Sequence, residues 1–342
     1  MPFSNEIRAG SSGQSTGFYN GAVEQSLRFN DDDSAYLNRT ITSASTGDGR
    51  KKSTFSCWIK QCKLNSSTIS HVLYNQGDDS GTNHYQIVLY QDDLYINDYD
   101  YGSSGSPGSD IILQTDRKFR DTTAWMNIIV RVDTTQSTAA DRVRVYINGV
   151  QETSFSTATY PDENADLYIM GQKTNSTGVN TAGTFIGRYT NSHKSDLYMA
   201  DVNFCDGQSL GPSSFGQNKD DIWIPKDTGG LTFGTNGFRL QFKETGTGTA
   251  SASTIGADTS GQTNHFTSNN MAASDSNMPD CPENNFAVQN SLFKGTSVTY
   301  AEGNLKVGPF SSLNSSTHAT VSTFAIPKDK KIYIEVECTD DT

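Results

Sequence analysis

Pairs of aspartates stand out in the first hundred residues, because carboxylates from neighbouring loops are the ligands that Ca²⁺ prefers. Asp78-Asp79 and Asp92-Asp93 both lie in polar, turn-like stretches between apolar runs. The spacing of an EF-hand loop is absent, and acidic pairs in loops are also common as solvated turns. We predict Asp78, Asp79, Asp92 and Asp93 as candidate Ca²⁺ ligands, with solvated turns as the alternative.

A second group of residues with useful chemistry follows in the stretch 92–105. Tyr95, Tyr99 and Tyr101 have the same parity, and Asp98 and Asp100 lie between them. If the segment is extended, the three rings point to one face of a strand. Aromatic rings and planar polar side chains on a surface are suited to contact a sugar or a protein. We predict these five residues as ligand-binding. The alternative is that the rings pack in the core or between subunits.

The composition excludes several classes of partner and favours short strands. The chain of 342 residues is long enough for a sizeable core, but only 34% of its residues are hydrophobic, and Ser, Thr, Asn and Gly are abundant. This mixture disfavours long helices and suits strands joined by polar turns. The formal net charge is −12 without a basic stripe, which argues against nucleic acid and anionic membranes as partners. No apolar run approaches the roughly 20 residues that a membrane helix needs.

The cysteines and the N-terminus predict folding in a reducing cytoplasm without a signal peptide. The five cysteines are odd in number and form no CxxC pair, which makes a zinc site improbable. Cys57 and Cys62 would lie on opposite faces of one strand, so we expect them not to pair with each other. The first seventeen residues lack an apolar segment.

From residue 24 onward, apolar and polar residues alternate in many short runs, which predicts an all-β antiparallel sandwich. Asn148-Gly149 predicts a tight hairpin turn, and Pro212 predicts a single helical turn after it. The alternation also predicts which residues face the core. They are Phe29, Phe55, Ile59, Ile87, Leu89, Ile129, Val143, Val145, Ile147, Ile186 and Phe204.

Changes in composition divide the chain into four predicted parts. Residues 1–23 form an N-terminal attachment arm, with a disordered terminus as the alternative, and residues 24–217 form the β-sandwich. Residues 218–285 are an appended β segment followed by a polar linker, because 245–285 is rich in Ser, Thr, Gly and Asn. The alternative for 245–285 is a loosely packed extended crossing. Residues 286–342 begin a second, truncated β-sandwich that ends in the expected edge strand KIYIEVE. We expect the natural chain to continue past Thr342, or another chain to complete this sheet.

Several of these runs resemble known families. TFSCWIK, AWMNIIVRVDTTQ, DRVRVYINGVQETSFS, FIGRY and LYMADVNFCDGQSLGPSSFG resemble concanavalin A-like lectin/glucanase domains, the laminin-G and pentraxin type above all. MPFSN, SLRFN and YLNRT are similar to the start of virion appendage proteins of marine bacteriophages. NNFAVQNSL, AEGNLKV and STFAIPKDKKIYIEVE resemble the beginning of a SPRY domain. The resemblance implies a concanavalin-like jelly-roll sandwich, followed by a β-rich linker and a partial second β-sandwich.

Catalytic patterns are missing from the sequence. Glucanases of this fold carry two carboxylates on one strand as E-x-D-x-x-E, which neither Glu152 nor Glu163 fits. Glu335 and Glu337 share a strand face but are better explained as solvent-facing residues. The five histidines are scattered, and no G-x-S-x-G or H-x-x-x-H pattern exists. The sequence predicts a protein that is not an enzyme.

We therefore expect a structural or adhesive protein of a phage virion, such as a tail fibre, an appendage or a capsid decoration. Through its arm it would contact other virion proteins, and its sandwich would bind a host glycan or protein during host attachment. We expect a homo-oligomer, and Ca²⁺ is the one candidate cofactor. The alternatives are a free lectin or adhesin and, with less support, a polysaccharide depolymerase.

Overall fold

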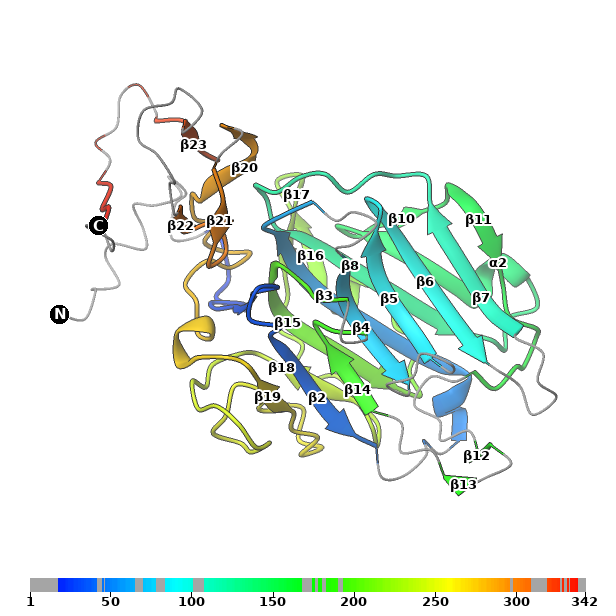
Figure 1. Ribbon diagram of the computed structural model, residues 1–342. Helices are drawn as coiled ribbons and strands as arrows, with labels where there is room; N and C mark the ends of the chain where they lie inside the picture. The colour runs from blue at the N-terminus through cyan, green and yellow to red at the C-terminus, as the bar shows by residue number, and fades with distance from the viewer. Residues whose placement is uncertain are drawn as a thin grey trace.

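The computed structural model describes residues 18–41, 45, 47–64, 70–77, 84–100, 108–167, 174–175, 178–179, 183–189, 193–295, 298–308, 319–326, 328, 331 and 333–337. Two antiparallel sheets lie face to face in these residues, as the two layers of Figure 1 show. The predicted all-β sandwich is confirmed. None of the helices in the described part of the chain is long and apolar enough to cross a membrane.

The first sheet has seven strands in the order β1-β15-β3-β8-β9-β10, and β18 also pairs with β15. Its strands are β1 (Leu27–Phe29), β15 (Leu197–Asp206), β3 (Lys52–Gln61), β8 (Met126–Asp133), β9 (Val143–Ile147), β10 (Val150–Glu152) and β18 (Phe238–Leu240). The β9–β10 turn contains Asn148 and Gly149 with φ angles of 48° and 76°. Both residue types tolerate positive φ, so the predicted hairpin is confirmed.

The second sheet has eight strands in the order β11-β7-β6-β5-β4-β14-β2-β19. Its strands are β11 (Phe155–Thr159), β7 (Gly108–Thr115), β6 (Asp93–Asp100), β5 (His84–Tyr90), β4 (His71–Gly77), β14 (Gly183–Ile186), β2 (Tyr36–Thr40) and β19 (Thr267–Asn269). Strand β14 comes late in the chain but lies between β2 and β4. This crossover brings side chains from distant parts of the sequence together.

Short elements complete the fold. They are η1 (Gly47–Arg50), α2 (Ala139–Arg142), η2 (Pro212–Ser214) and η3 (Ala273–Asp275), and the strand pairs β12 (Thr174–Asn175) with β13 (Gly178–Val179), β16 (Gly216–Lys219) with β17 (Ile222–Pro225), β20 (Gln289–Lys294) with β23 (Thr320–Ser322) and β21 (Tyr300–Ala301) with β22 (Lys306–Val307). The turn η2 confirms the helical piece expected after Pro212.

The main core lies between the two sheets and contains all the predicted core residues except Ile129. Ile129 is fully buried, but it packs with Tyr146, Phe215 and Phe233 on the outer side of the seven-stranded sheet. Strand β8 has three consecutive apolar residues, so its sequence does not show which parity faces inward. The prediction for Ile129 was wrong, because Ile128 and Val130 point into the main core instead.

The segment 245–285 crosses the sandwich as an ordered extended stretch, which was the alternative to a linker. Its strand β19 extends the eight-stranded sheet, and β18, just before the segment, extends the seven-stranded sheet. Ile255 and Phe266 are fully buried in the main core. Asp258 accepts hydrogen bonds from the backbone N–H groups of Arg239 (2.9 Å) and Asn264 (2.8 Å), which orders the polar stretch. A few apolar anchors and local hydrogen bonds therefore hold a segment whose composition is that of a linker.

The last residues of the predicted arm belong to the folded body. The Glu283 carboxylate accepts hydrogen bonds from the backbone N–H groups of Gly21 (2.8 Å) and Ala22 (3.0 Å), and Val23 is buried. Burial raises the pKa of Glu283. The remainder of the predicted arm, residues 1–17, lies outside the described residues.

The expected C-terminal edge strand is not formed in the described residues. Tyr333–Glu337 have no strand partner there, and Tyr333 and Val336 are more than four-fifths exposed. Alternating sequence alone does not form a strand, because the backbone groups need a neighbouring strand to pair with. Figure 1 places the orange-to-red strands β20, β21, β22 and β23 beside one end of the sandwich.

Four described cysteines, Cys57, Cys62, Cys205 and Cys281, are free and buried. The expectation that Cys57 and Cys62 do not pair is therefore confirmed. Burial raises the pKa of the Cys205 and Cys281 thiols to about 12, so both stay protonated and unreactive at neutral pH.

Candidate ligand-binding face

A row of side chains crosses the outer face of the eight-stranded sheet. Asn38, Phe185, Asn75, Gln86 and Asn97 are direct cross-strand neighbours on β2, β14, β4, β5 and β6. Their neighbours along each strand point into the main core, so alternation turns these five residues outward. We call this set the amide row. It continues to β19, where the Asn269 Nδ2 donates a hydrogen bond to Asn38 Oδ1 (2.7 Å).

The centre of the amide row holds polar atoms without partners. Asn75 is fully buried, yet neither its Nδ2 nor its Oδ1 has a hydrogen-bond partner among the described residues. Asn97 is 6% exposed, and its Nδ2 donates to the Tyr95 hydroxyl (2.9 Å) while its Oδ1 has no partner. An unsatisfied buried polar group costs about 1–3 kcal/mol. The fold retains this cost in the middle of a face that is otherwise well packed.

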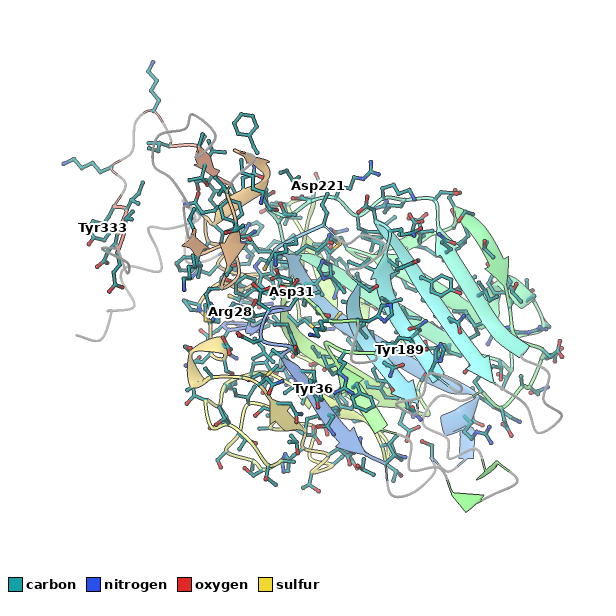
Figure 2. The ribbon with its side chains drawn as sticks, in the orientation of Figure 1. Arg28, Asp31, Tyr36, Tyr189, Asp221 and Tyr333 are labelled. Carbon is teal, nitrogen blue, oxygen red and sulfur yellow. The ribbon has the colours of Figure 1, made fainter. Side chains whose placement is uncertain are left out.

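Aromatic rings flank the amide row. Tyr36 packs against Phe185 with ring centroids 6.4 Å apart at one end, and half-buried Tyr95 lies at the other end beside Asn97. Tyr189 contacts His84 of β5, with 4.8 Å between the centroids and 3.2 Å from the Tyr189 hydroxyl to His84 Nδ1. Figure 2 shows Tyr36 and Tyr189 in front of the same layer of the sandwich.

His193 packs against Tyr189, with 5.6 Å between the ring centroids. Burial lowers the pKa of His193, which favours the neutral form of its ring. The face thus combines carboxamides that both donate and accept with rings that offer flat apolar surfaces. This combination suits a ligand that has hydroxyl groups and apolar C–H surfaces.

The structure separates the predicted ligand-binding residues. Tyr95 lies half-buried on the outer face, but Asp98 is almost fully buried, is opposite Tyr85 in the register, and has the other parity. Burial, with the Asp98 charge nearby, raises the pKa of Tyr85. Tyr99 and Asp100 belong to β6, but their side chains lie outside the described residues, as does the whole of Tyr101. Of the two predicted residues whose side chains are described, Tyr95 lies at the amide row and Asp98 does not.

The sequence argument missed the amide row itself. Asn38, Asn75, Gln86 and Asn97 each stand at the outward position of a predicted strand, where polar residues are expected in any sandwich. The sequence does contain one signal: four predicted strands each carry a carboxamide at an outward position, where a mixture of polar residue types would be expected. Knowing that they align requires the strand order and the register.

The described calcium candidates already have cationic partners. The Asp92 carboxylate is 2.7 Å from Arg120 Nε, and Asp93 pairs with Lys118 and accepts a hydrogen bond from Gln114 Nε2 (2.8 Å). Asp78 and Asp79 lie outside the described residues. No group of three or more His, Cys, Asp or Glu side chains is arranged for a metal within the described ranges. The calcium site stays a prediction.

The architecture is that of a lectin-type jelly roll, two large antiparallel sheets around one core. Residues 10–186 match the family model of the concanavalin A-like lectin/glucanases superfamily, just over half of the 342 residues. The chain therefore belongs to this superfamily. No curated protein matches the sequence.

Solved structures show distant likeness. A heptameric SAP-like pentraxin from Limulus polyphemus is 11% identical, with 56% of this chain and 79% of that chain covered and a TM-score of 0.35. A candidate carbohydrate-binding protein from Bacteroides ovatus is 11% identical, with 72% and 58% covered and a TM-score of 0.45. The LG4-5 domains of the mouse laminin alpha1 chain are 13% identical, with 70% and 54% covered and a TM-score of 0.35. The chain thus spans little more than half of the last two.

Proposed function

We propose that this protein is a non-catalytic binding protein that holds a glycan on the outer face of its eight-stranded sheet. The observation that carries the proposal is the amide row, with Asn75 buried and unpartnered at its centre. A sugar ring offers hydroxyl groups that donate and accept, and a carboxamide can do both. The flanking rings of Tyr36 and Tyr95 provide flat surfaces for its C–H groups.

The test measures glycan binding by the full chain on an array of neutral and acidic polysaccharides, followed by calorimetry. Asn75→Ala removes both carboxamide atoms from the centre of the row. Because hydrogen bonds to a buried ligand contribute about 1–3 kcal/mol, we expect affinity to fall by about 5- to 150-fold. Asn218→Ala changes an exposed amide on β16, which lies outside the eight-stranded sheet, and serves as the matched control.

Two outcomes would contradict the proposal. Glycan binding that Asn75→Ala leaves unchanged would move the site away from the amide row. Release of reducing ends from a bound polysaccharide would replace the binding role with hydrolysis.

We also propose a particular setting for this activity, a phage virion, where the protein would act in host attachment as a tail fibre, an appendage or a capsid decoration. The support is the resemblance of MPFSN, SLRFN and YLNRT to virion appendage proteins, together with the SPRY-like runs after residue 284. In this setting residues 1–17 would contact other virion proteins, and the protein would assemble as a homo-oligomer. Immunogold electron microscopy of virions with an antibody to this chain tests the idea. Labelling of host material alone would reject it.

A further inference from the structure

Lys60 of β3 lies at the centre of a buried polar cluster on the outer side of the seven-stranded sheet, opposite Tyr198 of β15. Its side chain is 1% exposed, and that of Asp280 is 6% exposed. The Lys60 Nζ is 2.8 Å from Asp280 Oδ2 and 2.8 Å from the carboxamide oxygen, Oδ1, of Asn285. The Trp125 indole Nε1 donates to the other Asp280 oxygen (2.8 Å). An amine, an amide and a carboxyl group therefore meet where little water reaches them.

The Asn285 carboxamide is held with its carbonyl group toward Lys60. Its Nδ2 donates to the Thr123 carbonyl oxygen (2.9 Å), which leaves Oδ1 to face the lysine. The Lys60 Nζ is also fixed by the Phe286 carbonyl oxygen, 2.7 Å away. Because Oδ1 is bonded to Cγ, the Lys60 nitrogen already lies beside the carbon that a nucleophile would attack. Such positioning turns an encounter of two groups into a reaction within one structure, which lowers the entropic part of the barrier.

Asp280 can make the amine reactive. An ammonium ion is not a nucleophile, but transfer of one proton to the carboxylate leaves two neutral groups, which are cheaper to bury than two charges. Asp280 Oδ2 and Asn285 Oδ1 contact the same nitrogen, so the protonated carboxyl group can then donate a hydrogen bond to the amide oxygen. This hydrogen bond polarises the carbonyl group and stabilises the negative charge that develops on its oxygen.

We propose that Lys60 and Asn285 are joined by an intramolecular isopeptide bond, with Asp280 as the catalytic residue. The Lys60 Nζ forms a bond to Asn285 Cγ, and the bond from Cγ to Nδ2 breaks. Asp280 takes one proton from the ammonium group, and a second passes from Nζ to Nδ2, which leaves as ammonia. Asp280 then returns its proton to the departing ammonia. Ammonium and carboxamide thus give an amide and an ammonium ion, and the reaction needs no oxidant or other co-reactant.

Lys63, just after β3, is a lysine in a different chemical setting. Its Nζ lies 2.8 Å from Asp31 and 2.9 Å from Asp196. A carboxylate is negatively charged and lacks a good leaving group, so an ion pair between a lysine and carboxylates is stable. The Asn285 carboxamide is the component that makes the cluster at Lys60 reactive.

The bond connects two segments that lie 225 positions apart in the chain. One is a central strand of the seven-stranded sheet, and the other belongs to the segment that covers the outer face of this sheet. Non-covalent covers are released by local unfolding. A covalent link keeps the cover attached through such openings.

Mass spectrometry of the denatured full-length protein tests the proposal. We expect an intact mass about 17 Da below the mass of the sequence, which corresponds to the lost ammonia. A tryptic digest should contain a branched peptide in which Lys60 is joined to Asn285. Urea unfolding does not replace this measurement, because loss of the buried ion pair destabilises the chain with or without the bond.

Three variants should retain the full mass of their sequence. Lys60→Arg removes the nucleophile, Asn285→Ala removes the carbon that it attacks, and Asp280→Ala removes the catalytic carboxyl group. Asn285→Ala keeps the ion pair and should fold, which near-ultraviolet circular dichroism checks. Lys63→Arg makes the same change as Lys60→Arg at a lysine without an amide partner, and it should show the same loss of mass as the native protein.

Two results would overturn the bond. A native protein that keeps its full mass after prolonged incubation would mean that Lys60 and Asp280 remain an ion pair. A loss of mass that persists in Lys60→Arg and Asn285→Ala would come from another group, such as a succinimide at Asn148-Gly149. A loss that persists in Asp280→Ala alone would reject the catalytic role of Asp280. Glycan binding does not enter these measurements, so the bond and the proposed function stand or fall separately.

Discussion

The two outer faces of the sandwich differ in what the chain does with them. The seven-stranded sheet turns large side chains outward, including Trp58 and Tyr198; Trp125, just before β8, packs with them, and later segments of the chain cover this cluster. The eight-stranded sheet turns carboxamides outward. Among them, the Asn75 carboxamide has no hydrogen-bond partner in the described residues. An apolar face must be buried to be stable, whereas an amide face can satisfy a polar ligand. Later segments of the chain thus cover one face, and we propose that the other binds a ligand.

A buried ion pair attaches the covering segment to the seven-stranded sheet. The side chain of Lys60 is 1% exposed, and its Nζ lies 2.8 Å from Asp280 Oδ2, 2.8 Å from Asn285 Oδ1 and 2.7 Å from the Phe286 carbonyl oxygen. The Trp125 indole Nε1 donates to the other Asp280 oxygen (2.8 Å). Both charges are therefore fully hydrogen-bonded where water is excluded.

The largest effect that we predict comes from breaking this pair. Asp280→Ala leaves the Lys60 ammonium buried without its carboxylate, and the free energy of unfolding should fall by about 3–5 kcal/mol. Urea unfolding at pH 7 measures it. The double variant Lys60→Met with Asp280→Leu should lie much closer to the native protein, because no buried charge remains. A single variant as stable as the double variant would contradict this account of the covered face.

An amide introduced into the covered face tests the comparison directly. Ile129 is fully buried under Phe215 and Phe233, so Ile129→Asn loses apolar burial and buries an unsatisfied carboxamide. We expect a loss of about 3–4 kcal/mol in the free energy of unfolding. Val150→Asn, at an exposed position on β10 of the same sheet, is the control and should change stability by about 0.5 kcal/mol or less. Similar losses of unfolding free energy in both variants would mean that Phe215 and Phe233 do not pack tightly over Ile129.

A buried histidine of the eight-stranded sheet predicts a pH dependence. His71 is fully buried at the start of β4, and burial, opposed in part by its hydrogen bond to the Lys63 carbonyl oxygen, lowers its pKa from 6.5 to about 4. Between these values the unfolded chain binds a proton that the folded protein does not bind. Stability should therefore fall as the pH drops from about 6.5 to 4, by about 2–3 kcal/mol.

The surroundings of His71 require a matched control. Lys63 and Asp31 add opposing charges nearby, and burial raises the pKa of Asp196 to about 6, which favours the folded state at low pH. His71→Gln retains all three groups, so their contributions cancel in the comparison. We expect the variant to lose less stability than the native protein between pH 7 and pH 5 in urea unfolding. Parallel pH profiles would show that His71 does not titrate in this range.

The smallest predicted effect has the opposite sign. Asn75→Leu replaces an unpartnered buried amide with an apolar side chain, and stability should rise by about 1 kcal/mol while glycan binding is lost. Asn203 is the matched control, because it is equally buried on the covered side but hydrogen-bonded to Asp201 (2.8 Å) and Thr228 (2.9 Å). Asn203→Leu should therefore destabilise the protein in the same thermal unfolding assay. A destabilised Asn75→Leu variant would mean that the amide serves the fold.

The local pattern of the sequence was sufficient for the strands and most of the core. Val143, Val145 and Ile147 face inward as their alternation predicts, because the period of two is a property of each strand by itself. The Asn148-Gly149 turn likewise depends only on what its two residues tolerate. The resemblance to the concanavalin-like family rested on the same strands and was correct for the fold.

Only the tertiary structure determines which residues align in the amide row and which outer face other segments cover. Asn38, Phe185 and Asn75 are neighbours only because β14 enters the sheet between β2 and β4. Ile129 points to the outer side of its sheet and is buried there, because the distant residues Phe215 and Phe233 pack over it. Strand order, register and coverage are non-local, so no short stretch of sequence contains them. Alternation shows which residues point outward, but only the assembled sheets show what they meet there.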